Sequence, residues 1–286
     1  MEWDKDGRDW PNRDASRFVE SRPHRWHVQV AGEGPTLLLL HGTGGATHSW
    51  RDLLPHLAER FEVVALDLPG HGFTRRGTRH RSGLAPMAAD IWTLCDAQGW
   101  RPDAIVGHSA GGALAVEMAA SRDGRALGAV IGLNAALGGF EGAAGLVFPA
   151  MAKALASLRV VPRLVARLPG GERRIEAMLD ATGSRIDARG RALYARLLSD
   201  PEHIDGALAM MAAWTTRGLP TKLASLDIPV TLMAGTNDRT VPSRVSEAAA
   251  ARARHGEFLD LGPLGHLAHE ERPDLVADEI GARIRI

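Results

Sequence analysis

The sequence has little of what marks several classes of protein. Its 286 residues include one cysteine, Cys95, so the chain cannot close an internal disulfide and is compatible with a reducing compartment. No apolar run approaches the roughly 18 residues that a membrane helix needs. The first 17 residues are mostly polar and lack the apolar stretch of a signal peptide, so we expect a cytoplasmic protein.

Neither sign of charge is in excess. Lysine plus arginine number 34, and aspartate plus glutamate also number 34, which gives a formal net charge of zero. Because nucleic-acid binding relies on a basic surface, this balance gives no reason to expect a nucleic-acid partner. The chain is long enough to bury a sizeable core as one large domain with an insertion.

A metal-binding pattern is also missing, although the sequence has 12 histidines. His266 and His269, followed by Glu270 and Glu271, lack the His-Glu-x-x-His spacing with which a helix binds zinc. We therefore expect no metal and no cofactor. We also expect His269 to lie at the surface or at the edge of a pocket, and His108 to be packed rather than catalytic.

The most informative motif that is present is Gly-x-Ser-x-Gly, which runs from Gly107 to Gly111. An apolar strand, residues 104–106, leads into it, and a helix of small residues leaves it. In this arrangement a strained strand-to-helix turn projects a serine hydroxyl above a sheet, and the glycines allow a turn too tight for Cβ atoms. The motif predicts Ser109 as a nucleophile.

A nucleophilic serine needs a base and an acid that orients the base, and both follow later strands. Residues 230–234 form an apolar strand followed by a loop with Asp238, and residues 257–261 form a shorter strand followed by His266. The order serine, aspartate, histidine is one of those in which a catalytic triad occurs along a chain. We predict that His266 accepts the proton of Ser109 and that Asp238 orients His266.

A glycine-rich loop, residues 41–45, follows the apolar strand expected at residues 36–40. Such a loop supplies one backbone amide of an oxyanion hole, and the residue after the nucleophile supplies the other. We predict that the amides of Thr43 and Ala110 hold the oxyanion of a tetrahedral intermediate. Asn134, at the end of another strand, cannot replace the charged Asp238.

Apolar strands alternate with helical segments over most of the chain, as in a mostly parallel sheet with helices on both faces. The expected strands are residues 18–20 and 26–30, which are antiparallel, and then 36–40, 62–66, 104–106, 129–133, 230–234 and 257–261. The expected helices are residues 50–60, 86–99, 109–121, 243–255 and 273–284. We predict an α/β core of residues 1–136 and 227–286, with a helical lid of residues 137–226 inserted after the sixth strand.

The expected lid has an apolar helical face that can serve either of two purposes. Ala207, Met210, Met211 and Trp214 fall at positions i, i+3, i+4 and i+7. This face either packs on the core or roofs a substrate pocket, where methionine adapts to a large flat ligand. The second alternative makes Met210, Met211 and Trp214 candidate substrate-binding residues.

A second apolar face in the expected lid raises the question of membrane contact. Met151, Leu155 and Leu158 fall on one side of a helical pattern whose polar positions carry several basic residues. A basic amphipathic helix can lie on an anionic membrane. Peripheral membrane contact therefore stays open beside the alternative of a plain lid helix.

Together these motifs resemble the α/β-hydrolase family over nearly the whole chain. The matching segments are residues 41–44 with Trp50, residues 67–72, the serine turn, Asn237–Asp238, and Gly265–His266 with Glu271 and Pro273. More narrowly, residues 3–13 and 206–214 resemble the BchO family, the hydrolase-like accessory proteins of magnesium chelatase in bacterial photosynthesis gene clusters. That resemblance implies bacteriochlorophyll biosynthesis and a tetrapyrrole-like substrate, and it leaves direct contact with chelatase subunits open.

Three functions remain open at this point. The first is a cofactor-free serine hydrolase that cleaves an ester or another carbonyl bond of an apolar substrate. The second is a non-catalytic accessory protein that holds or hands over a tetrapyrrole, in one version with a histidine on the chlorin magnesium. The third is a side activity such as perhydrolysis or carbon–carbon bond hydrolysis.

The N-terminal arm, with Trp3 and Trp10, either docks a partner or covers the first strands.

Overall fold

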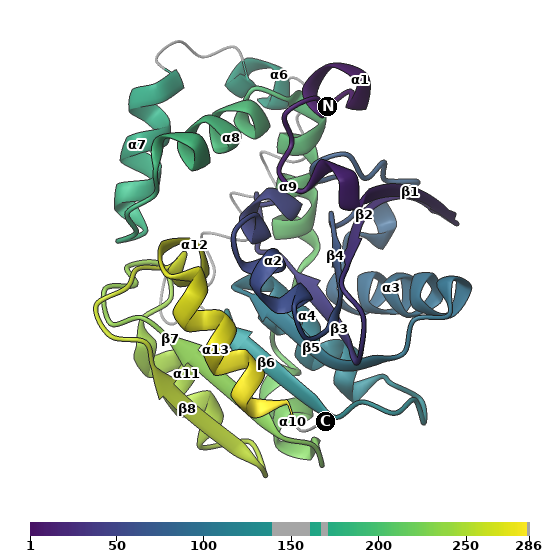
Figure 1. Ribbon diagram of the computed structural model, residues 1–286, viewed down its shortest axis with the longest axis vertical. Coiled ribbons are helices and arrows are strands. Elements are labelled where there is room, and N and C mark those ends of the chain that lie inside the picture. The colour runs from purple at the N-terminus through teal and green to yellow at the C-terminus, as the bar shows by residue number, and fades with distance from the viewer. Residues whose placement is uncertain (139–160, 167–170, 285–286) are drawn as a thin grey trace.

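A computed structural model describes residues 1–138, 161–166 and 171–284, and its centre is an eight-stranded sheet in the order β1-β2-β4-β3-β5-β6-β7-β8 (Figure 1). The first two strands are antiparallel, β2 also runs antiparallel to β4, and the other neighbours are parallel. This arrangement confirms the predicted mostly parallel sheet. The strands are β1 (Ser16–Ser21), β2 (His24–Ala31), β3 (Thr36–Leu40), β4 (Glu62–Leu66), β5 (Pro102–His108), β6 (Ala129–Leu133), β7 (Val230–Ala234) and β8 (Gly256–Asp260).

Helices cover both faces of the sheet because its central strands are apolar on both sides. In β3, Leu38 and Leu40 join one buried cluster, whereas Leu37 and Leu39 join another on the opposite face. The first cluster includes side chains of α3 (Leu84–Gln98), α4 (Ala110–Ala120), α10 (Leu219–Ser225) and α11 (Ser243–Ala250). The second includes side chains of α2 (Leu53–Ala58) and α13 (Pro273–Arg283). Cys95 is fully buried in the first cluster.

Several predicted bounds needed correction. The helix expected at residues 50–60 is a short 3-10 helix, η2 (Thr47–Trp50), followed by α2. The helix expected at residues 243–255 ends at Ala250, because the chain then turns directly back into β8. At that turn a Cβ on Gly256 would lie 1.9 Å from the Ala250 carbonyl oxygen. The last strand begins and ends one residue earlier than expected.

The described part of the insertion between β6 and β7 contains helices joined by turns and no strand, as predicted. They are α6 (Val161–Ala166), α7 (Gly171–Ala181), α8 (Ala188–Leu198), α9 (Pro201–Ala213) and α10. Figure 1 shows α6, α7 and α8 gathered at one end of the molecule, away from α10. The predicted face of Met151, Leu155 and Leu158 lies outside the described residues.

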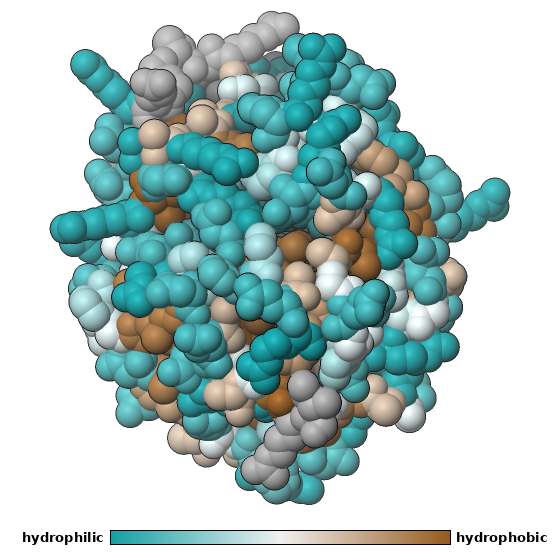
Figure 2. Space-filling view, viewed as in Figure 1, coloured by the Kyte–Doolittle hydropathy of each residue, from teal (hydrophilic) through white to brown (hydrophobic). Residues whose placement is uncertain are grey.

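The surface seen in Figure 2 is mostly hydrophilic, with small apolar patches between the polar side chains. Within the described ranges, the large apolar side chains with substantial exposure are Leu164 and Met178, at 60% and 40%. Both belong to the inserted helices α6 and α7. None of the helices in those ranges is both long and apolar enough to cross a bilayer.

The N-terminal arm packs on its own chain. It contains the short helices α1 (Trp3–Asp6) and η1 (Arg13–Ala15). Trp10 is 2% exposed, and its indole N–H donates to Thr47 Oγ1 at 3.0 Å. Trp3 and Trp10 both meet the Phe73 ring edge-on, with centroids 4.9 and 5.0 Å apart. The structure therefore favours the covering role for this arm.

A buried carboxylate, Asp67, joins three segments just after β4. Its Oδ1 accepts the Thr47 N–H at 2.6 Å, and its Oδ2 accepts the Phe73 N–H at 2.8 Å and His27 Nδ1–H at 2.7 Å. Burial by itself raises the pKa of Asp67, but His27 and these hydrogen bonds outweigh burial and hold the pKa well below its usual range. The carboxylate thus fixes η2, which continues the glycine-rich loop.

We predict that Asp67→Ala lowers the free energy of unfolding by about 3–5 kcal/mol, because it leaves three buried donors without an acceptor. Urea denaturation at neutral pH measures this. The control is Asp274→Ala, at an exposed carboxylate paired with Arg272, which should change stability by less than about 0.5 kcal/mol. Equal effects of the two substitutions would contradict the role given to Asp67.

Candidate active site

The Gly-x-Ser-x-Gly turn has the strained geometry that its sequence predicts. Ser109 lies between β5 and α4 with φ +52°, a left-handed conformation that is uncommon for a residue with a side chain. A Cβ on Gly107 would lie 2.2 Å from the Gly111 carbonyl oxygen, and one on Gly111 would lie 2.0 Å from that of Leu40. Glycine is therefore required on both sides of the serine.

Asp238 and His266 are hydrogen-bonded to each other, as predicted from their positions after β7 and β8. His266 Nδ1 lies 2.8 Å from Asp238 Oδ2, and both side chains are nearly inaccessible to solvent. Because an ionised carboxylate only accepts, the proton of this bond is on Nδ1, which leaves Nε2 as the basic nitrogen. Asp238 Oδ1 accepts the backbone N–H groups of Thr240 and Val241 at 2.7 and 2.8 Å.

The imidazole of His266 lies beside the serine turn. His108 immediately precedes Ser109, and its ring centroid is 4.8 Å from that of His266. His108 Nε2 donates to the His266 carbonyl oxygen at 2.9 Å, so His108 is packed as expected. Burial, together with the neighbouring His269 and His266, holds the pKa of His108 well below its usual value. Within the described part of the chain, the Ser109 hydroxyl has no hydrogen-bond partner.

The glycine-rich loop before η2 is a tight turn against the serine. The Gly45 N–H donates to the Gly42 carbonyl oxygen at 3.0 Å, and Gly44 has φ +78°. A Cβ on Gly42 would lie 3.0 Å from Ser109 Cβ. The amides of Thr43 and Ala110 donate to no acceptor in residues 1–138, 161–166 and 171–284. For Ala110 this follows from its position as the first residue of α4.

The predicted lid face lies on α9, and its members have different surroundings. Met210 is fully buried, and its sulfur accepts the Thr43 hydroxyl at 3.6 Å. Trp214, just beyond the helix, is half-buried and donates its indole N–H to the Ser82 carbonyl oxygen at 3.0 Å. Met211 is also half-buried. Met210 therefore contacts the glycine-rich loop, whereas Trp214 packs on the core before α3.

His203 attaches α9 to two loops of the core, a role that its sequence did not reveal. Its Nδ1 accepts the Gly72 N–H at 3.0 Å, and its Nε2–H donates to the Gly44 carbonyl oxygen at 3.1 Å. This pair of bonds requires a neutral ring, and burial lowers the pKa of His203 to about 4. A Cβ on Gly206, one turn later, would lie 2.0 Å from the Gly70 carbonyl oxygen, so the helix and loop are in backbone contact.

Asn134 is a further residue whose role was missed. It follows β6 with φ +47°, and its amide donates to Asp238 Oδ2 at 2.8 Å. Sequence reasoning excluded it as the charged acid, which agrees with its role here as a donor to that acid. Its position at the carboxyl end of a strand was the available signal.

Within the described residues, no group of three or more His, Cys, Asp or Glu side chains is placed to hold a metal ion. His41 Nδ1 donates to the Gly42 carbonyl oxygen at 2.7 Å, and its Nε2 accepts the Leu68 N–H at 2.9 Å. His269 was expected at the surface or at the edge of a pocket, but it is not at the surface. Its ring is fully buried, 4.7 Å from that of Trp50, because α12 (Ala268–Glu271) packs beneath η2.

A buried carboxyl, Glu270, connects three parts of this region. Its Oε1 accepts the hydroxyls of Ser49 and Tyr194, each at 2.6 Å. Ser49 belongs to η2 and Tyr194 to α8, whereas Glu270 follows His266 on α12. Burial raises the pKa of Glu270 to about 7, although the two hydroxyls and the nearby Arg51 charge lower it.

The raised pKa makes stability depend on pH in a defined direction. Since the folded-state pKa of Glu270 is above that of the unfolded chain, its contribution is fully present below about pH 4.5 and is lost as the pH rises through about 7. Relative to Glu270→Gln, the wild type should lose about 2 kcal/mol of unfolding free energy between pH 5 and pH 8. Guanidinium denaturation of both proteins at the two pH values measures the difference.

Glu59→Gln, at an exposed position near the end of α2, is the matched control and should differ from the wild type by the same amount at both pH values. A pH-independent difference for Glu270→Gln as well would mean that Glu270 does not change protonation in this range.

Comparison with known proteins places the chain in a family. Residues 35–273 match the family model described as the alpha/beta hydrolase fold. The chain is 45% identical to the magnesium-chelatase 30 kDa subunit of Rhodobacter capsulatus, over 93% of each protein. It is 31% identical to a pimeloyl-[acyl-carrier protein] methyl ester esterase of Xanthomonas campestris, over 89% of this chain and 96% of that one.

A solved structure agrees in fold. An alpha/beta hydrolase fold protein from Burkholderia ambifaria superposes with a TM-score of 0.74 at 22% identity, over 94% of this chain and all of that one. The Rhodobacter match confirms the narrower resemblance to BchO-like proteins. The chain belongs to the α/β-hydrolase family.

Proposed function

We propose that this protein is a serine hydrolase that cleaves an ester or a related carbonyl bond of an apolar substrate, in a step linked to tetrapyrrole synthesis. The observation that carries the proposal is the hydrogen-bonded pair of Asp238 and His266 beside the strained turn of Ser109. A protein that only binds a ligand needs neither this pair nor a serine in a left-handed conformation.

In the proposed mechanism Ser109 Oγ attacks the substrate carbonyl carbon while His266 Nε2 takes its proton. Asp238 keeps the His266 proton on Nδ1 and stabilises the imidazolium that forms. The imidazolium then protonates the leaving oxygen, and an acyl-serine remains. Water, deprotonated by His266, releases the acid and restores the serine.

The amides of Thr43 and Ala110 are the proposed donors to the oxyanion. Both lie next to Ser109 in the fold, and neither is engaged within the described residues. A donor of this kind typically contributes about 3–4 kcal/mol to lowering the barrier. The lid residues in the proposal are Met210, whose sulfur accepts the Thr43 hydroxyl, and the half-buried Met211 and Trp214.

The names of two relatives support the proposed substrate. The Xanthomonas relative is named as a methyl ester esterase, which supports an ester bond, and the Rhodobacter relative is named as a subunit of magnesium chelatase, which supports the tetrapyrrole link. The proposal includes a lid of residues 137–226 over a core of residues 1–136 and 227–286.

The name of the Rhodobacter relative also favours another function, that of a non-catalytic accessory protein that holds a tetrapyrrole for the chelatase. The two functions differ in what they require of Ser109. A carrier tolerates loss of the hydroxyl, whereas the hydrolase does not.

We expect a fluorophosphonate probe to label the wild type at Ser109, and Ser109→Ala to lose both labelling and hydrolysis of p-nitrophenyl esters by roughly 10³-fold or more. Ser225→Ala, which removes an exposed serine from α10, should keep wild-type labelling. Mass spectrometry of the labelled protein and initial rates measure the two outcomes.

A folded wild-type protein that the probe does not label would count against hydrolysis. If Ser109→Ala also bound a porphyrin and fully restored pigment synthesis in cells that lack the gene, the accessory function would replace the proposal. Accumulation of a tetrapyrrole ester in Ser109→Ala cells would instead identify the substrate.

A further inference from the structure

A short turn of the insertion reaches the loops that carry both Asp238 and His266. It consists of Thr182, Gly183 and Ser184, the first three residues of the connection from α7 to α8, and we refer to it as the 182–184 turn. Nothing in its sequence suggested a role, since it lies in the middle of the expected lid. Its contacts are with the core.

Three hydrogen bonds join the 182–184 turn to the two loops. The Thr182 carbonyl oxygen accepts the N–H groups of Arg239 and His266, each at 3.2 Å. Ser184 Oγ accepts the Leu267 N–H at 2.8 Å in a buried position. One carbonyl group thus binds the residue after Asp238 and His266 itself.

The backbone of the 182–184 turn also packs directly against the Asp238 and His266 loops, with no space for a side chain between them. Gly183 has φ +81°, and a Cβ there would lie 2.0 Å from the Asn237 carbonyl oxygen. A Cβ on Gly265 would lie 2.4 Å from the Gly183 carbonyl carbon and from Ser184 N. The backbone of the turn therefore sets how closely the residues before Asp238 and before His266 approach each other.

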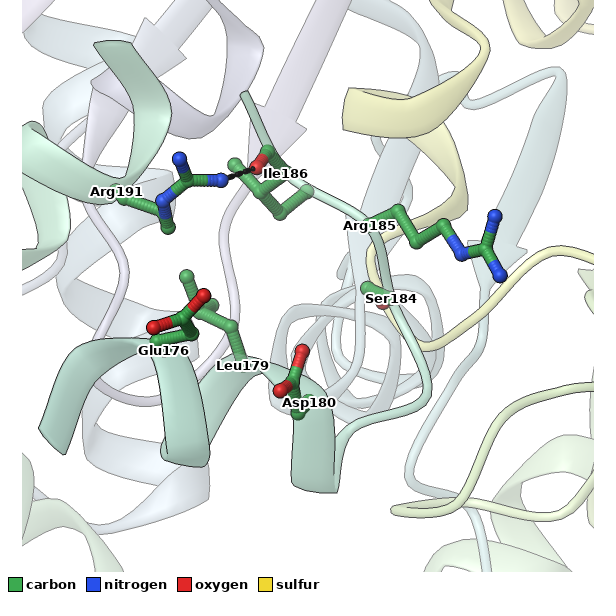
Figure 3. Close-up of a pocket in the computed structure, with 7 residues that line it drawn as sticks. All are labelled: Glu176, Leu179, Asp180, Ser184, Arg185, Ile186 and Arg191. Atoms are coloured by element: carbon green, nitrogen blue, oxygen red, sulfur yellow. Dashed lines mark hydrogen bonds between the residues drawn. The ribbon is translucent and has the colours of Figure 1, made fainter. Parts of the chain in front are cut away.

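Hydrogen bonds within the 182–184 turn fix its conformation, and a cavity lies on its other side. Thr182 Oγ1 donates to the Leu179 carbonyl oxygen at 2.5 Å and accepts the Ser184 N–H at 3.3 Å, which closes the end of α7. On its other side Ser184 lines a cavity of about 140 Å³ between α7 and the segment that leads into α8 (Figure 3).

We propose that Thr182, Gly183 and Ser184 are positioning residues that hold the Asp238 and His266 loops at the separation their hydrogen bond requires. This inference rests on the proposed hydrolase function. It makes the inserted helices part of the catalytic framework. A misplacement of about 1 Å at a reacting group lowers rates on the order of 100-fold, so a small shift of this turn should be visible in kcat.

The test compares Gly183→Ala with Gly124→Ala. Both glycines have nearly the same positive φ, +81° and +79°, but no atom lies within 4 Å of the Cβ position at Gly124. Backbone strain is therefore matched, and only Gly183→Ala pushes on a core loop. We expect Gly183→Ala to lower kcat for p-nitrophenyl esters roughly 10- to 100-fold with little change in KM, and Gly124→Ala to leave kcat unchanged.

A second readout does not depend on activity. The proton between His266 Nδ1 and Asp238 should give a downfield proton NMR resonance, assigned by its loss in His266→Ala. Gly183→Ala should shift or broaden this resonance, whereas Gly124→Ala should not. If the wild type proves to have no esterase activity, the proposed function fails, but the resonance still decides whether the turn positions the pair.

If Gly183→Ala does not fold, Ser184→Ala tests the positioning role of the turn instead. It removes one acceptor and should lower kcat roughly fivefold and shift the same resonance, and Ser184→Thr should restore both, since the adjoining cavity has room for a methyl group. A folded Gly183→Ala, or Ser184→Ala in its place, with wild-type kcat and an unchanged resonance would overturn the proposal.

Discussion

The carboxylate of Asp238 is the group on which the geometry of the candidate site depends. An ionised carboxylate has about four acceptor positions, and here four donors fill them: the Asn134 amide, His266 Nδ1–H and two backbone N–H groups of its own loop. These donors follow β6, β7 and β8, so a single buried charge holds three strand ends in register. Because an unpaired buried charge is costly, the three loops can settle only in an arrangement that brings all four donors together.

Backbone contacts rather than side-chain packing complete that arrangement. Gly111 lies against the carbonyl oxygen of Leu40, and Gly183 lies against that of Asn237; in each case an added Cβ would be only 2.0 Å away. Side chains in a core can change rotamer, but two backbones in contact have no such freedom. The carboxyl end of the sheet is therefore stiff where the chemistry is proposed, and the left-handed conformation of Ser109 is sustained by the strands on either side of it.

Features with a local cause in the sequence could be predicted from the sequence alone. The bounds of β3, β4, β6 and β7 were predicted to the residue, because each is a short, mostly apolar run. The pairing of Asp238 with His266 followed from their places after neighbouring strands. Asn134, by contrast, meets Asp238 across 104 residues, and no local pattern encodes that contact. The burial of His269 was missed for the same reason, since it is caused by the packing of η2, more than 200 residues earlier.

The insertion between β6 and β7 is joined to the candidate site at several separate points. His203 on α9 binds the glycine-rich loop through Gly44, and Met210 meets Thr43 about two turns further along the same helix. The 182–184 turn binds the other side, at His266 and Arg239. Each attachment ends on a residue of the proposed mechanism or on its neighbour in the chain. Movement of α9 away from the core would therefore disturb the amide of Thr43, and movement of α7 would disturb the loop of His266. The position of the inserted helices and the geometry of the candidate site are consequently coupled through these contacts.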